Sequence, residues 1–82
     1  MKMARATLFI RLHGHLWRYE PLGRAQVELP WKAGKTLAEW ANDLGVPQDQ
    51  IMVALVNGEY LPLAGCPGPG DRVELLPVID GG

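Results

Sequence analysis

The first thirty residues alternate between apolar and polar side chains in two separate stretches. In residues 6–12, one face of an extended chain is apolar and predicts a strand, with Leu8, Ile10 and Leu12 on that face. In the second stretch, which ends at Pro30, Ala25, Val27 and Leu29 oppose Gln26 and Glu28. Glycine and proline interrupt residues 13–23, so we expect an irregular connection between two antiparallel strands.

The apolar period then changes from that of a strand to that of a helix. After a turn at residues 32–35, apolar side chains recur at i, i+3, i+4 and i+7 and form one stripe: Leu37, Trp40, Ala41 and Leu44. Thr36 and Glu39 have the spacing of a capping box at the start of a helix. Gly45 is placed to end the helix in a left-handed conformation, and Pro47 prevents its continuation.

The second half of the chain returns to strands. Residues 51–56 are apolar throughout, which predicts a strand with little solvent on either face. Asn57-Gly58 is typical of a type I′ hairpin turn, which leads into a short return strand at residues 59–61. Residues 62–70 form a loop rich in proline and glycine. Asp71 opens a last strand, in which Val73, Leu75 and Pro77 oppose Glu74, Leu76 and Val78.

This order of elements predicts an α+β domain in which one mixed β-sheet packs on one main helix. We expect the domain to span residues 1–78. Residues 79–82 are expected to form a flexible tail that ends in Gly81-Gly82.

Composition narrows the classes of function. The chain has 82 residues, enough for one domain, and its net charge of −1 offers no basic surface for nucleic acid. Its longest apolar run is too short for a membrane span, so neither nucleic acid nor membrane is an expected partner. The single cysteine, Cys66, excludes an internal disulfide and fits a reducing cytoplasm. With two histidines, His13 and His15, and one cysteine, no metal site is expected, and the histidines are expected to be solvated.

The diglycine end carries the candidate chemistry. A carboxylate is a poor electrophile, but adenylation by another enzyme would open the Gly82 carbonyl to attack by sulfide or an amine. Such an enzyme must thread the tail through a channel, and residues without Cβ suit that passage. Fully extended, residues 79–82 would project about 13 Å at ~3.3 Å per residue. Gly82 and Gly81 are therefore the candidate reactive residues.

Three motifs, together with the order of the elements, resemble the MoaD/ThiS family of ubiquitin-like sulfur-carrier proteins. The motifs are Val56-Asn57-Gly58, Gly70-Asp71-Arg72-Val73 and Leu76-Pro77-Val78-Ile79-Asp80-Gly81-Gly82. The resemblance covers essentially the whole chain and implies the ubiquitin-like β-grasp fold.

The resemblance also implies a function. Gly82 would be adenylated by a ubiquitin-activating-type enzyme that uses ATP, and a sulfur donor system would convert it to a thiocarboxylate. The acceptor would be the large subunit of molybdopterin synthase, for a molybdenum or tungsten cofactor, or thiazole synthase. The chain itself would be no enzyme, at most a non-catalytic subunit of a synthase, and would hold no permanent cofactor. Its length and full first hairpin favour the molybdopterin type.

The tail departs from the family pattern at two places. One proline, Pro77, stands where two are common, and Asp80 replaces the usual small residue before the diglycine. These departures leave the activating enzyme and the acceptor open. We expect partners to dock at Leu76, Val78 and Asp80, with Leu61 beside them. A modifier that is conjugated through Gly82 to a lysine, and a plain β-grasp binding module, remain the alternative functions.

Overall fold

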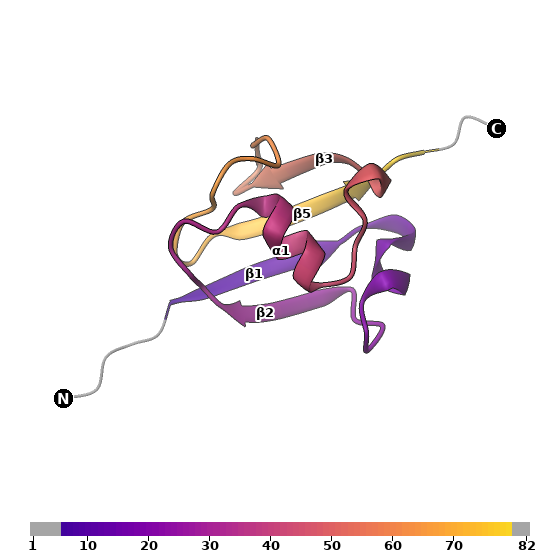
Figure 1. Cartoon of the computed structure of the whole chain (residues 1–82), viewed down its shortest axis with the longest axis horizontal. Coiled ribbons are helices and arrows are strands. Elements are labelled where there is room, and N and C mark those ends of the chain that lie inside the picture. The colour runs from indigo at the N-terminus through magenta and orange to yellow at the C-terminus, as the bar shows by residue number, and fades with distance from the viewer. Residues whose placement is uncertain (1–5, 80–82) are drawn as a thin grey trace.

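The computed structural model describes residues 6–79. The sheet order is β2-β1-β5-β3-β4, and α1 lies across one face of the sheet (Figure 1). The strands are β1 (Thr7–Leu12), β2 (Gln26–Pro30), β3 (Ile51–Val56), β4 (Glu59–Tyr60) and β5 (Arg72–Pro77). The helices are α1 (Leu37–Asp43) and two short 3-10 helices, η1 (Gly14–Tyr19) and η2 (Gln48–Gln50). The expected α+β architecture is confirmed.

The two halves of the chain meet in the middle of the sheet. The first hairpin pairs β1 antiparallel with β2, with Leu8 opposite Leu29. The second half pairs β3 antiparallel with both β4 and β5. A parallel pairing of β1 with β5, with Ile10 opposite Val73, joins the halves and makes the sheet mixed. The last strand therefore lies at the centre of the sheet and not at its edge.

The hydrophobic core lies between the sheet and α1. All four residues of the predicted helical stripe are buried, and Trp40 is 3% exposed. The strands contribute their inward-facing side chains: Leu8, Ile10, Leu12, Val27, Ala54, Val73 and Leu75. The alternation predicted for the first and last strands is confirmed.

Local signals fix both ends of α1. The Thr36 side chain accepts a hydrogen bond from the Glu39 backbone N–H at 3.1 Å, and Glu39 Oε1 accepts one from the Thr36 N–H at 2.8 Å. This is the predicted capping box. Gly45 follows the helix with φ of 80°, as expected for a left-handed end. Asn57 and Gly58 also have positive φ, 53° and 86°, as the predicted turn requires.

Two expectations about the strands and their connections are wrong. The connection at residues 13–23 was expected to be irregular but contains the 3-10 helix η1, which buries Leu16, and Glu20 after it is also buried. In β3, a register shift between Ile51 and Val53 turns Met52 outward, where it is 59% exposed. One face of β3 therefore meets solvent, because α1 covers only the other face of the sheet.

In the described range 6–79, no helix combines the length and the apolar character needed to cross a bilayer.

Candidate functional site

The end of β5 directs the chain away from the body of the domain. Figure 1 shows the yellow end of the chain leaving the sheet beyond the last residue of β5. The Val78 backbone N–H still donates to the Gln50 carbonyl at 2.9 Å, but Val78 and Ile79 are already 40% and 74% exposed. The predicted residues Asp80, Gly81 and Gly82 lie outside the described residues. The expected boundary between domain and tail therefore stays a prediction.

The connection after β1 holds the last residues of β5 in place. The His13 backbone N–H donates to the Leu75 carbonyl at 3.0 Å. Gly14 packs directly on the Pro77 ring, since a Cβ at Gly14 would lie 2.6 Å from Pro77 Cγ. With a φ of 60°, Gly14 also has a backbone conformation that favours glycine. These contacts determine the direction in which the tail leaves the sheet.

Both histidines lie near the root of the tail. His13 Nε2 is 3.1 Å from Glu74 Oε2, and His15 Nε2 is 3.3 Å from Gln50 Oε1. Each side chain is partly exposed, so both histidines contact solvent as well as a polar neighbour. In the described part of the chain, no three His, Cys, Asp or Glu residues form a cluster that could hold a metal ion.

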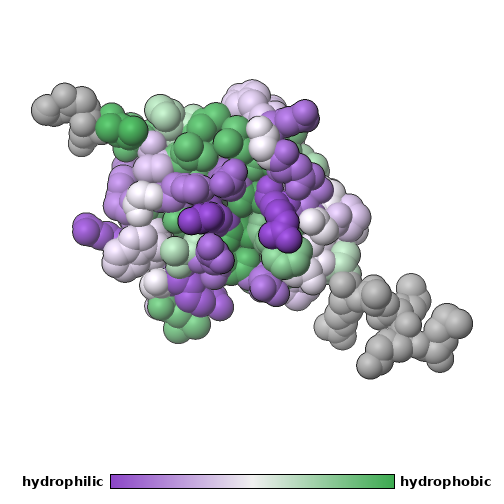
Figure 2. All heavy atoms as spheres, turned by 180° about the vertical axis from the view of Figure 1, so that it is seen from behind, coloured by the Kyte–Doolittle hydropathy of each residue, from purple (hydrophilic) through white to green (hydrophobic). Residues whose placement is uncertain are grey.

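An apolar patch lies beside the tail on the face of the sheet that α1 leaves uncovered. Cross-strand pairing places Leu76 opposite Val53 and Leu55 opposite Tyr60. We call these four residues the outer patch. Figure 2 shows this face of the molecule, with hydrophobic side chains toward the tail and hydrophilic side chains across its middle. Tyr60 is 67% exposed, and the other three are half-buried. The patch is therefore accessible to a partner that also grips the tail.

The structure separates the predicted docking residues. Leu76 lies in the outer patch, and Val78 is exposed just beyond it. Leu61 lies elsewhere: its backbone N–H donates to the Ala54 carbonyl at 3.1 Å, and its side chain packs against the core. Ala54 faces α1, so Leu61, its neighbour across the hairpin, faces that side too. The position expected for Leu61 beside Leu76 is wrong.

Sequence reasoning missed the other members of the outer patch. The apolar run of β3 hides which of its side chains point outward, and only its pairing with β5 reveals this. The Asn57-Gly58 turn was the sequence signal from which the outward-pointing side chains could have been predicted. A two-residue turn sets the register of the hairpin, and this register places Leu55 opposite Tyr60.

A buried carboxylate organises the connection between η1 and β2. Glu20 is 4% exposed and accepts hydrogen bonds from the backbone N–H groups of Leu22 and Arg24, at 3.0 and 2.7 Å. The Arg24 guanidinium adds two more, from Nε at 3.1 Å and Nη2 at 2.7 Å. The Arg24 side chain, opposed by burial, lowers the pKa of Glu20 from 4.5 to about 2. The spacing of four residues was the only sequence signal for this pair.

Acid should weaken the fold through Glu20. Because folding lowers its pKa, the stabilisation by Glu20 is complete above pH 4.5 and is lost as the pH falls toward about 2. Glu20→Gln should therefore have a clearly lower free energy of unfolding than the wild type at neutral pH, and this difference should disappear in acid. Urea unfolding across this pH range measures the difference in the free energy of unfolding. Glu28→Gln, at an exposed carboxylate, is the control. A stability difference between Glu20→Gln and the wild type that stays constant with pH would contradict the lowered pKa of Glu20.

The remaining candidate side chains have structural surroundings. Cys66 is an exposed free thiol in the loop at residues 62–70. The Trp31 indole Nε1–H donates to the Pro67 carbonyl at 2.9 Å, so Trp31 anchors the same loop. The start of α1 binds this loop as well, since the Leu37 and Ala38 N–H groups donate to the carbonyls of Gly65 and Leu63, both at 2.9 Å. Trp17 is 41% exposed.

Solved structures of other small proteins share this fold. The small archaeal modifier protein 1 of Haloferax volcanii superposes with a TM-score of 0.68 and 21% identity, over 90% of this chain and 99% of that one. A second crystal structure of the same Haloferax protein, there called SAMP1, superposes with a TM-score of 0.66 and 23% identity, over 93% of this chain and 99% of that one. Urm1 of Trypanosoma brucei superposes with a TM-score of 0.70 and 16% identity, over 99% of this chain and 100% of that one. At these identities the likeness shows the fold alone, and it confirms the expected β-grasp.

Sequence comparison identifies the family. No curated protein matches the chain. The sequence profile described as Mut7-C ubiquitin matches residues 1–81, almost the full length of the chain. This match confirms the ubiquitin-like part of the expected resemblance. The chain belongs to the Mut7-C ubiquitin family.

Proposed function

We propose that this chain is a ubiquitin-like sulfur carrier that acts through the carboxylate of Gly82. The observation that carries the proposal is the end of β5, where a central strand runs directly into exposed chain beside the outer patch. An activating enzyme could hold the outer patch while it draws the tail into its active site. The chain would be a substrate of partner enzymes and would supply no catalytic side chain.

The chemistry needs ATP and a sulfur donor. The Gly82 carboxylate attacks the α-phosphorus of ATP, pyrophosphate leaves, and an acyl adenylate forms. Sulfide then attacks the acyl carbon, AMP leaves with the bond electrons, and one proton is released. The product is a thiocarboxylate in which sulfur has replaced one oxygen. The acceptor we favour is the synthase subunit that builds the molybdenum or tungsten pterin, with thiazole synthase as the alternative.

Intact mass spectrometry tests this proposal. The chain of residues 1–82 is incubated with ATP, sulfide and an activating enzyme of the ubiquitin-activating type. The expected result is a mass gain equal to the exchange of one oxygen for one sulfur, and fragmentation should place the sulfur on Gly82. An acyl adenylate that forms but never gains sulfur would contradict the carrier function. Omission of ATP is the control.

A protein modifier is the second candidate, because one similar structure is described as a small archaeal modifier protein. In this case a lysine amine attacks the same acyl adenylate and forms an isopeptide bond. Adding a mixture of cell proteins to the activation reaction separates the two functions. Remnants of residues 73–82 on lysines after tryptic cleavage at Arg72, without thiocarboxylate, would favour the modifier over the carrier.

Leu76→Glu should weaken binding of the activating enzyme at least tenfold, which corresponds to about 1.4 kcal/mol. Leu76 lies on the outer face, so a charge there should leave the core intact while it disrupts an apolar contact. Calorimetry measures the affinity, and circular dichroism confirms folding. Gln26→Glu, at an exposed position on β2, which β1 separates from β5, is the matched control. Normal affinity of a folded Leu76→Glu protein would place the docking surface elsewhere.

A further inference from the structure

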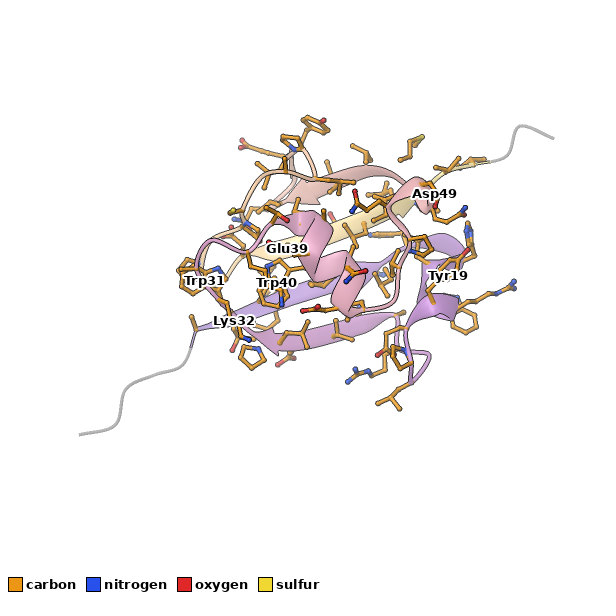
Figure 3. All side chains as sticks on the ribbon, viewed as in Figure 1. Tyr19, Trp31, Lys32, Glu39, Trp40 and Asp49 are labelled. Carbon is orange, nitrogen blue, oxygen red and sulfur yellow. The ribbon has the colours of Figure 1, made fainter. Side chains whose placement is uncertain are left out.

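A second candidate surface lies on the other side of the sheet from the outer patch. A groove of about 400 Å³ separates α1 from β2. Its apolar wall consists of Leu29 from β2 with Trp40 and Leu44 from α1, and Lys32 and Lys35 lie along its margin. Figure 3 shows Trp40 and Lys32 at the end of β2 that is remote from the C-terminal end of the chain.

The groove opens beside an unpaired edge of the sheet. Among residues 6–79, β2 is the outermost strand of the sheet, and only the side of β2 that faces β1 is paired. The Leu12 N–H donates to the Ala25 carbonyl, and the Trp31 N–H donates to the Ala6 carbonyl. The backbone N–H and C=O groups of the odd-numbered residues from 25 to 31 therefore point toward β1. The N–H and C=O groups of Gln26 and Glu28 consequently point away from the sheet. Such an edge is a template for an additional strand.

The wall of the groove contains an unpaired donor. The indole Nε1 of Trp40 is buried and has no hydrogen-bond acceptor in the described part of the protein. The Lys35 ammonium lies 4.2 Å from the centroid of a Trp40 ring and pairs with Asp43. Burying an N–H without an acceptor is unfavourable. A partner that brought an acceptor to Nε1 would remove this cost.

The charge of the groove favours an acidic partner at one end. Three cationic side chains line it, but Arg24 is paired with Glu20 and Lys35 with Asp43. Lys32 is exposed, and among residues 6–79 it has no carboxylate partner. On the opposite face of the same edge, Glu28 presents a negative charge. One face of an added strand would therefore meet the groove and Lys32, and its other face would meet Glu28.

We propose that the edge of β2 and this groove bind an extended peptide segment of a partner protein as an additional strand. Alternate side chains of the segment enter the groove and are apolar, and those between them are polar or basic and lie beside Glu28. A carboxylate on the segment pairs with Lys32. The proposal is independent of Gly82, because activation of the tail involves neither this edge nor this groove.

Two other occupants fit the site less well. A second copy pairing through its own β2 would bring two Glu28 side chains onto one face, where like charges disfavour pairing. It would also leave Lys32 without a carboxylate. The tail of the same chain starts at the wrong end of the sheet. β5 ends near Leu12 of β1, whereas Lys32 follows Pro30, which pairs with Thr7 at the other end of β1.

A peptide titration monitored by NMR tests the proposal. The probe is the synthetic peptide Ser-Val-Lys-Ile-Thr-Val-Asp-Asp, blocked at both ends, added to ¹⁵N-labelled protein. The expected result is saturable shifts of the Gln26 and Glu28 amides and of the Trp40 indole N–H. A peptide with proline in place of the central isoleucine, and one with Lys-Lys in place of Asp-Asp, should bind at least tenfold more weakly. The first loses a ladder N–H, and the second reverses the charge that meets Lys32.

Protein variants complete the test. Lys32→Glu should weaken binding of the acidic probe at least tenfold and restore binding of the Lys-Lys peptide, whereas Arg18→Glu, an equal charge change outside the groove, should alter neither. Absence of shifts at millimolar peptide would overturn the proposal. It would also be overturned by shifts confined to the outer patch, or by shifts of the Gln26 and Glu28 amides that depend on protein concentration without peptide. The last result would show that a second copy occupies the edge.

Discussion

Trp40→Ala is expected to lower the free energy of unfolding by about 3–5 kcal/mol. Trp40 is 3% exposed and belongs to the cluster that joins α1 to the sheet. Removing its ring would leave a cavity that the short helix α1 cannot fill. Native domains are stable by only about 5–15 kcal/mol, so this one change could remove most of the stability. Equilibrium unfolding in urea, followed by circular dichroism, measures the loss.

Two variants show whether the loss comes from packing. Trp40→Phe keeps most of the buried area and removes the unpaired indole N–H, so its cost should be well below that of alanine. Trp17→Ala removes an indole that is 41% exposed and should have a much smaller effect. If Trp40→Ala cost no more than Trp17→Ala, the packing of α1 on the sheet through Trp40 would be refuted.

Deletion of Gly82 should abolish sulfur loading and leave the melting temperature unchanged. The reason for the first effect is chemical, because the proposed acyl adenylate forms on the Gly82 carboxylate and a shortened tail no longer reaches the ATP. The reason for the second is structural, because the core consists of residues between Leu8 and Leu75. Intact mass after activation and thermal unfolding of the same preparation give both measurements.

The thiol at Cys66 requires a control. It is exposed, and where dissolved oxygen serves as the two-electron oxidant, sulfide can convert it to a persulfide, which adds a sulfur atom without loss of oxygen. Cys66→Ser should load sulfur as the wild type does. Loading that persists after the deletion of Gly82 but disappears in Cys66→Ser would refute the proposed role of the terminus.

The elements with local causes could be predicted from the sequence. Thr36 and Glu39 form their capping box within one helical turn, and the Asn57-Gly58 turn needs no contact from outside the hairpin. The faces of β1 follow from its alternation, since Leu8 and Ile10 are buried. Each of these features depends on residues a few positions apart.

The candidate site could be predicted only in part. Leu76 was expected on an outer face and lies there, because the alternation of β5 with Val73 and Leu75 determines its side. Leu61 was misplaced, because its side depends on the register of the hairpin with β3. The register shift at Met52 depends on cross-strand contacts that no local pattern of side chains reports. The spacing of Glu20 and Arg24 indicates that they pair, but not that Glu20 is buried.

The sequence by itself determined the five strands and α1, the two faces of β1, β2 and β5, and the diglycine end, because each depends on neighbouring residues. Only the tertiary structure decided that β5 lies beside β1 at the centre of the sheet, and that Val53, Leu55 and Tyr60 join Leu76 in one patch. It also decided that β2 keeps an open edge beside a groove. The physical reason is that strand pairing joins residues far apart in the chain, so a strand's own pattern specifies its faces but not its neighbours.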